Sequence, residues 1–376
     1  MLTTFGLDYT LLVVSAGSGL LGLVSGVLGV FAVLRKQSLL GDAVAHAALP
    51  GIALMFLMTQ TRQTELLLLG ATLTGVLATS AIIAIDRFSR IKYDSALALV
   101  LSVFFGFGLV LITFIQKIPT ANQAGLDKFI FGQASTMLMR DVRLMIWVTL
   151  VMLGLTILFW KELKMFSFDP GFAEVAGFST RRINALLSGM LVAAIMIGLQ
   201  TVGVILMSAL IVAPGAAARQ WSDRLWVVAM LAGFFGAVSG LIGTLISSSL
   251  TKMPTGPTIV IVLSLFTLTS LVAAPNRGLL WKHLRQRKSQ QLISAEKTLK
   301  SIYLLAMNHD NHHHSHDMAM IKPSKNISGK PAPALHRAVE SLEHQGLVRR
   351  DADNQVAITP QGIQHVKGHL MEGGEQ

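Results

Sequence analysis

Apolar runs of about 20 residues recur from Leu11 to Ala274, and they constrain the fold of this chain more than any other feature. A helix rises about 1.5 Å per residue, so each run is long enough to cross the hydrocarbon core of a membrane. Only 14% of the residues are charged, far below the roughly 25% of soluble domains. The chain is therefore predicted to be an all-α polytopic membrane protein.

We expect nine transmembrane helices, at about 11–34, 38–59, 64–85, 95–116, 142–160, 183–201, 203–218, 225–248 and 258–275. The sixth and seventh are short and meet at Gly203, which predicts either a tight hairpin or partly broken helices that line a cavity. The small residues of 16–29, AGSGLLGLVSGVLG, favour close packing of one helix on another.

Basic residues predict the orientation, because cytoplasmic loops of membrane proteins carry an excess of Lys and Arg. With the N-terminus outside, the inner loops hold eleven basic residues and the outer loops five. The basic cluster at 277–288 then lies inside, as an odd number of spans requires. We expect the chain in the bacterial cytoplasmic (inner) membrane, with 117–141 extracellular, 161–182 cytoplasmic and a cytoplasmic tail.

An aspartate and a histidine interrupt the second apolar segment, LLGDAVAHAALP at 39–50. Asp42 and His46 are four residues apart and share one face of a helix. Ionisable residues at membrane depth indicate a functional site, and a carboxylate with an imidazole suits Mn, Fe or Zn. A mutually hydrogen-bonded structural pair is the alternative. Asp94, at the start of the fourth segment, is a second candidate ligand or a plain helix cap.

The sequence does not indicate an enzyme. It has no G-x-x-x-x-G-K-[ST] motif, so ATP hydrolysis would belong to a separate chain. Cysteine is absent, which excludes thiolate metal sites. No permanently bound cofactor is expected; the divalent metal would be cargo.

The inner loop at 161–182 contains a short helix signal. Asp169 is a good N-cap, Pro170 suits the first helical position, and Gly177 would end the helix. Phe172 gives the helix an apolar side chain and Glu174 a charge. We interpret it as a docking helix for a cytoplasmic partner, against the alternative of an interfacial helix that only joins two spans.

The tail is soluble in composition. We divide the chain into three parts: a transmembrane domain at 1–280, a basic and His-rich linker at 281–330, and the remainder of a small winged-helix domain at 331–376. The linker includes the first helix of the tail, predicted at 292–307. Helix 331–346, two strands around the D-A-D-N turn and a helix after Pro360 predict that α+β fold. Its candidate cytoplasmic metal ligands are His309, His312, His313, His314 and His316. Its candidate nucleic-acid contacts are Lys330, His336, Arg337, Arg349 and Arg350, although acidic residues interleave with them.

Four blocks resemble the permeases of the metal-specific ABC-3 family, the membrane subunits of manganese, zinc and iron importers: 27–54, 93–112, 167–178 and 201–218. The resemblance spans about residues 8–275. It implies that Asp42 and His46 form the intramembrane metal site and that FDPGFAEVAG is the coupling helix for an ABC ATPase subunit. It also implies two permease subunits, identical or different, and an extracytoplasmic metal-binding protein facing 117–141.

Residues 289–370 resemble the DNA-binding half of a diphtheria-toxin-repressor-type metalloregulator, in the pieces AEKTLKSIYLLA, ALHRAVESLEHQGLVRRD and ITPQGIQHV. The sequence departs from that pattern before Pro331, where the His tract stands and no clean second helix is visible. The leading hypothesis is a permease subunit of an ATP-driven importer, for manganese before zinc or iron. The alternatives are a membrane-tethered metal-responsive regulator and a permease whose winged-helix tail regulates transport.

Overall fold

The computed structural model describes residues 9–61, 63–117, 132, 137–199, 201–250, 253–307, 316–317, 332–351 and 355–372. The chain divides into two compact units, Met1–Gly278 and Leu279–Gln376.

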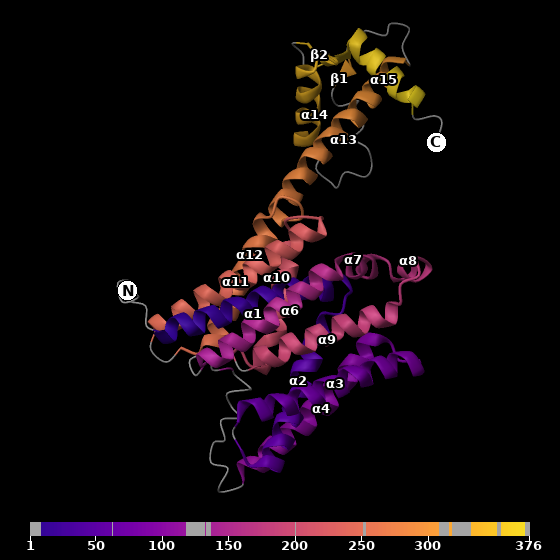
Figure 1. Cartoon of the computed structure of the whole chain (residues 1–376). Helices are drawn as coiled ribbons and strands as arrows, with labels where there is room; N and C mark the ends of the chain where they lie inside the picture. The colour runs from indigo at the N-terminus through magenta and orange to yellow at the C-terminus, as the bar shows by residue number, and fades with distance from the viewer. Residues whose placement is uncertain are drawn as a thin grey trace. The chain divides into compact units, whose positions relative to one another are not determined.

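The first unit is helical (Figure 1). Its helices are α1 (Tyr9–Leu34), α2 (Ser38–Thr59), α3 (Thr64–Phe88), α4 (Tyr93–Gln116), α6 (Met139–Leu158), α7 (Trp160–Phe168), α8 (Pro170–Val175), α9 (Thr180–Leu199), α10 (Val204–Arg219), α11 (Leu225–Ser249) and α12 (Thr255–Ala273). Within the described ranges, eight of them are long and apolar enough to cross a membrane. The prediction of an all-α polytopic membrane protein is confirmed.

The expected count of about nine spans exceeds the eight candidate spans by one, because α10, the seventh predicted segment, has only 16 residues. At 1.5 Å per residue it reaches about 24 Å, less than the hydrocarbon core of a bilayer. Gly203 precedes it with a φ of +85°, a conformation that only glycine adopts easily, and this residue lets the chain turn sharply after α9. Helix α10 then packs mainly against α1, α2, α11 and α12 and touches α9 little, so the two do not form a side-by-side hairpin.

Helices α1 and α11 pack most extensively against each other, and small residues form their crossing. A Cβ atom built on Gly22 would collide with the carbonyl group of Gly236, and one built on Gly236 would collide with the carbonyl group of Gly22. The same mutual approach repeats at Gly26 with Ala232, where the added atom would meet a backbone carbonyl oxygen. The predicted role of 16–29 in close helix packing is confirmed.

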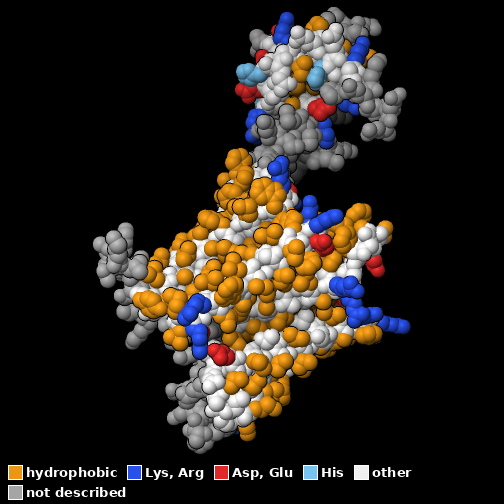
Figure 2. Space-filling model, viewed as in Figure 1, with side chains coloured by type: hydrophobic (Ala, Val, Ile, Leu, Met, Phe, Trp, Pro, Cys, Tyr) orange, Lys and Arg blue, Asp and Glu red, His pale blue; other side chains and the backbone are white. Residues whose placement is uncertain are grey.

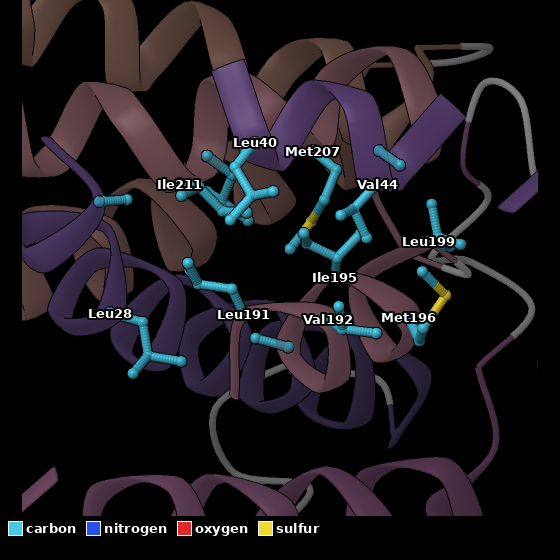
Figure 3. Packing of buried hydrophobic residues seen from close by; sticks show 14 of the residues in the cluster. Leu28, Leu40, Val44, Leu191, Val192, Ile195, Met196, Leu199, Met207 and Ile211 are labelled. Carbon is cyan, nitrogen blue, oxygen red and sulfur yellow. The ribbon is translucent and has the colours of Figure 1, made fainter. Parts of the chain in front are cut away.

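Helix α2 lies at the centre of this unit. In its most apolar stretch 72% of the residues are buried, whereas only 22% are buried in the corresponding stretches of α4 and of α6. Most side chains of α4 and α6 therefore face outward. Figure 3 shows Leu40 and Val44 of α2 beside Met207 and Ile211 of α10, with Ile195 of α9 next to them. Hydrophobic side chains also cover much of the outer face of the unit, as expected for a lipid-facing surface (Figure 2).

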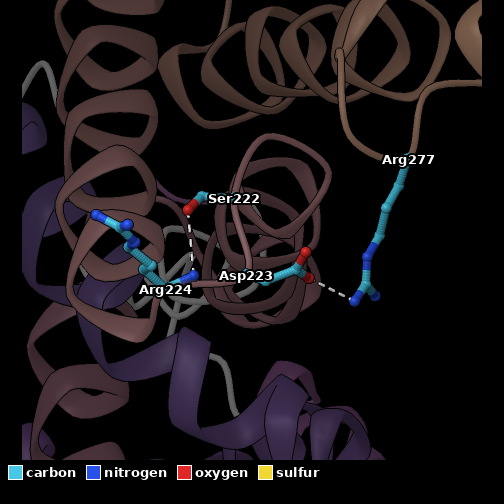
Figure 4. A network of polar contacts seen from close by, with 4 residues as sticks. All are labelled: Ser222, Asp223, Arg224 and Arg277. Atoms are coloured by element: carbon cyan, nitrogen blue, oxygen red, sulfur yellow. Dashed lines mark hydrogen bonds and ion pairs between the residues drawn. The ribbon is translucent and has the colours of Figure 1, made fainter.

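The connection between α10 and α11 holds the end of α12. The Trp221 indole Nε1–H donates to Ser270 Oγ at 3.0 Å, and Arg277 forms an ion pair with Asp223 (Figure 4). The Asp223 and Arg277 side chains are about half exposed or more, so we assign this pair a positioning role and little stabilisation. These contacts position residues 270–277, at the end of the first unit, against the α10–α11 connection.

The second unit contains α13 (Leu279–Met307), β1 (His316–Asp317), α14 (Ala332–His344), β2 (Val348–Arg350), β3 (Gln355–Ile358) and α15 (Pro360–Glu372). The strands form an antiparallel sheet in the order β1-β3-β2. Ile302 of α13, Val339 of α14 and Val356 of β3 are fully buried in its core.

Three expectations for the tail can be compared with this unit. Helix α13 begins earlier than the predicted 292–307, because no Gly or Pro interrupts 279–307. Strands β2 and β3 lie on either side of the D-A-D-N turn, as expected. The second helix of a winged helix-turn-helix would fall among residues 318–331, outside the described residues. The described residues of this unit form a small α+β arrangement and do not make up a complete winged-helix set.

Candidate metal-ion site and connecting loop

Helix α2 carries both members of the candidate site. Asp42 and His46 are its fifth and ninth residues, which places them about 6 and 12 Å along the helix axis from its first residue. His46 Nδ1 lies 3.3 Å from Asp42 Oδ1, and the two side chains are 14% and 32% exposed. The pair therefore lies inside the helical bundle, and the carboxylate is the more accessible partner.

The tautomer of His46 follows from its backbone contact. The ring Nδ1 lies 2.9 Å from the Asp42 carbonyl oxygen, which can only accept a hydrogen bond. A neutral ring that donates through Nδ1 keeps the lone pair of Nε2 free for a metal ion. The His46 and Phe105 rings, the latter on α4, also meet edge to face with 4.8 Å between their centroids, which limits the orientation of His46.

Two features around the pair were not identified from the sequence. The Ser208 hydroxyl of α10 lies near enough to the Asp42 carboxylate to donate a hydrogen bond to it. Pro50 has no N–H, so the carbonyl of His46 lacks its usual helical donor one turn later. Helix α4 covers this break, because a Cβ on Gly108 would lie 2.9 Å from Pro50 Cδ.

Asp94 lies apart from the pair. It is the second residue of α4, and its side chain is exposed. Across the described ranges, no three His, Asp or Glu side chains come together in a group that could hold a metal ion. The structure thus brings Asp42 and His46 together and leaves Asp94 outside their cluster.

The short helix predicted in the loop is α8. Asp169 caps it, since Oδ1 accepts a hydrogen bond from the Phe172 N–H at 2.9 Å, and Pro170 occupies the first turn. Gly177 follows with a φ of +86°, and the Phe178 N–H donates to the Ala173 carbonyl at 3.0 Å. These local signals were sufficient to predict both ends of the helix.

The surface of α8 is apolar and solvent-accessible. Phe172 is 60% exposed and Val175 88% exposed, and the Glu174 side chain is exposed beside them. Only Ala173 turns inward, with no exposed surface. A six-residue helix that shows its large apolar side chains to the outside has the form of a docking element.

The tail candidates are only partly described. His309, His312, His313, His314 and Lys330 lie outside the described residues, and His316 belongs to β1. His336 and Arg337 on α14 and Arg349 and Arg350 on β2 are exposed. Arg349 pairs with Asp351 at 3.4 Å, so part of the positive charge is neutralised locally.

Comparison with known proteins assigns the helical unit. The model of the ABC 3 transport family matches residues 8–274. The chain belongs to this family. The zinc transport system membrane protein TroC of Treponema pallidum is 50% identical over 281 residues, which are 75% of this chain and 94% of TroC. The manganese transport system membrane protein MntC of Bacillus subtilis is 42% identical over 352 residues, 93% of this chain and 79% of MntC.

A solved structure agrees with this assignment. A structure described as PsaBC from Streptococcus pneumoniae in complex with Fab matches with a TM-score of 0.65 and 29% identity, over 74% of this chain and 96% of that chain. The match to MntC of Bacillus subtilis covers 93% of the chain, so it must extend into Leu279–Gln376, whereas the family model ends at residue 274. This ABC 3 protein therefore combines the family's membrane unit with a tail that some relatives share.

Proposed function

We propose that this ABC 3 protein is the permease subunit of an ATP-driven importer of divalent metal ions, and that the ion passes Asp42 and His46. The observation that carries the proposal is a carboxylate and an imidazole 3.3 Å apart in the most buried candidate span of a transport-family protein. Ionisable groups inside a membrane helix are costly and rare, so their presence marks a site that function requires. ATP hydrolysis resides on a separate ABC ATPase subunit.

The geometry suits an ion that must bind and then leave. The pair supplies the Asp42 carboxylate oxygens and His46 Nε2, a mixed set that Mn, Fe and Zn all accept. Two protein ligands leave most coordination positions to water, so binding stays weak enough for passage. A second permease subunit, identical or different, would bring a second pair to the pathway.

Manganese is the metal that we propose first. The manganese transport protein MntC of Bacillus subtilis matches 93% of the chain, whereas the zinc transport protein TroC matches 75%. The shared tail supports manganese, and the higher identity of TroC supports zinc. Neither Asp42 nor His46 separates the two metals by ligand chemistry, and iron also fits the pair.

The remaining parts of the importer follow from the same assignment. We assign α8, with Asp169, Pro170, Phe172, Glu174 and Gly177, as the helix that docks on the ATPase. The N-terminus then lies outside and the tail in the cytoplasm of the bacterial cell, with α10 as a short ninth crossing inside the protein. An extracytoplasmic metal-binding protein delivers the ion to the outer end of the pathway. Asp94, at the start of α4, lies at the cytoplasmic side in this orientation, apart from the pair.

Metal accumulation tests the proposal directly. The chain is expressed with its ATPase and metal-binding protein in cells that lack other high-affinity uptake, and Mn, Zn and Fe are measured by elemental analysis. We expect manganese to accumulate, and to stop accumulating when the ATPase partner cannot hydrolyse ATP. Accumulation of zinc or iron alone would refute the choice of manganese, and accumulation of none would refute the importer.

We further propose that the tail is a regulatory module with a winged-helix fold. It has its own buried core, and Arg337, Arg349 and Arg350 are exposed on it. We consider three roles for the tail: regulation of transport, DNA binding, and regulation of transcription from the membrane. Each role predicts a different effect of deleting the tail.

Removal of residues 289–376 is expected to leave the initial rate of metal uptake unchanged, because the Asp42–His46 pair and α8 lie in the other unit. We expect the truncated permease to continue uptake when cytoplasmic metal is high, while the full chain slows. The measurement is a time course of metal accumulation at low and high external metal. Loss of initial uptake on truncation would contradict a purely regulatory tail.

A further inference from the structure

The connection between α1 and α2 is short and tightly hydrogen-bonded. The Arg35 N–H donates to the Phe31 carbonyl at 3.1 Å, and the Gln37 N–H donates to the Ala32 carbonyl at 2.9 Å. Lys36 between them has a φ of +57°, a conformation that a side chain disfavours. Such a corner has few conformations available, so a displacement at Arg35 reaches the start of α2 directly.

The Arg35 side chain joins this corner to two other helices. Its guanidinium carbon lies 3.6 Å from the centroid of the Phe166 ring on α7, and its Nη1 donates to Asn184 Oδ1 on α9 at 3.2 Å. Phe166 is only 3% exposed. Among the described residues no carboxylate forms an ion pair with Arg35, so stacking and the amide hydrogen bond hold this half-buried cation.

Burial lowers the pKa of the Arg35 guanidinium from its usual value, but an arginine side chain keeps its proton in proteins. The charge at this position is therefore permanent. The contact with Phe166 does not depend on pH, and a lysine would preserve the charge without the planar stacking surface.

Helix α7 is fixed to the end of α1 by more than Arg35. The rings of Phe31 on α1 and Trp160 on α7 meet edge to face at 5.8 Å between centroids, and Leu163 of α7 is fully buried. A single residue, Asp169, separates α7 from the exposed α8. Figure 1 shows α7 and α8 following each other at one end of the bundle. The two short helices can thus move as one body.

We propose that Arg35 is a positioning residue that transmits displacement of α7 and α8 to the start of α2, and so to the Asp42–His46 pair, whose Asp42 lies seven residues after Arg35. This inference rests on the proposed function, because it assumes that the ATPase acts on α8. The Asp169 N–H donates to the Met165 carbonyl at the end of α7, and Phe166 of the same helix stacks on Arg35 in the α1–α2 corner, so a continuous path leads from α8 to α2. Arg35 touches neither the metal pair nor the docking surface of α8.

The test separates transport from ATP hydrolysis in the complete importer. Permease, ATPase and metal-binding protein are reconstituted in lipid vesicles with manganese as the probe. We compare wild type with Arg35→Ala, Arg35→Lys and Phe166→Leu, and use Arg90→Ala, an exposed arginine after α3, as the matched control. Each variant is measured for ATPase recovered with the permease, ATP hydrolysis, and manganese transported per ATP hydrolysed.

We expect Arg35→Ala to lower manganese transported per ATP about tenfold, the size of a typical coupling between two sites. ATP hydrolysis and recovered ATPase should stay at the wild-type level, as should every value for Arg90→Ala. Phe166→Leu should reproduce the loss, and the double variant should lose no more than Arg35→Ala alone. Arg35→Lys should fall between wild type and Arg35→Ala.

Two reference variants distinguish this inference from the proposed function. Asp42→Ala should lose transport, and Phe172→Ala should lose recovered ATPase. If wild type transports and both references behave as stated, an unchanged transport ratio in Arg35→Ala and Phe166→Leu overturns the role of Arg35 alone. If Arg35→Ala does not assemble, Phe166→Leu and Arg35→Lys decide by the same ratio. Transport in Asp42→Ala would instead overturn the metal pathway.

Discussion

Replacing Asp42 by asparagine is expected to lower manganese uptake by about 100-fold or more, since even the loss of a partner that only orients a metal ligand costs about 10- to 100-fold. Asparagine keeps the size of the side chain, but it removes the charge that attracts the cation and offers a single neutral oxygen. The fold should survive, because the carboxylate is 32% exposed and its contacts lie within α2 or toward Ser208. Uptake is compared at equal amounts of assembled importer.

The matched control is Asp86→Asn, which removes an exposed carboxylate near the end of α3. It should take up metal at the wild-type rate. His46→Ala should reproduce the loss seen in Asp42→Asn, because each residue supplies a different ligand type to one ion. Wild-type uptake in the double variant Asp42→Asn/His46→Ala would show that the pair is structural and that the ion takes another path.

The parts of the site that the sequence predicts are those that depend on one helix. Asp42 and His46 meet because four residues make about one helical turn, and Asp169 caps α8 because its side chain reaches a neighbouring N–H. Neither contact needs information on how helices pack. The roles of these residues stay predictions, although their placement follows from local geometry.

Contacts between distant segments could not be predicted in the same way. Ser208 approaches Asp42 across the α2–α10 contact, and Arg35 stacks on Phe166, 131 residues later, because α7 docks on the end of α1. Hydropathy gives the position of each helix but not its neighbours. The seventh apolar segment is already short in the sequence, but the packing of α10 against α1, α2, α11 and α12 is not visible there.

Replacing Gly22 by leucine is expected to destabilise the helical unit by about 3 kcal/mol or more, a large part of the roughly 5–15 kcal/mol that proteins have in total. The glycine-lined crossing of α1 and α11 leaves no room for a side chain, because even a Cβ at Gly22 would meet the carbonyl of Gly236. The helices would have to separate along their whole contact, and α1 also carries Phe31, against which α7 packs.

Gly154→Leu provides the control for this substitution. Gly154 lies on α6, and a Cβ there would meet no atom within 4 Å, so leucine adds apolar surface without a collision. We expect Gly154→Leu to match wild type in its thermal unfolding temperature in detergent and in its yield of monodisperse protein. Gly22→Leu should unfold at a lower temperature and give a lower yield. Gly22→Ala should also be less stable than wild type, because the first added carbon already collides. Equal stability of all four proteins would mean that α1 and α11 lie further apart in the membrane than their glycines indicate.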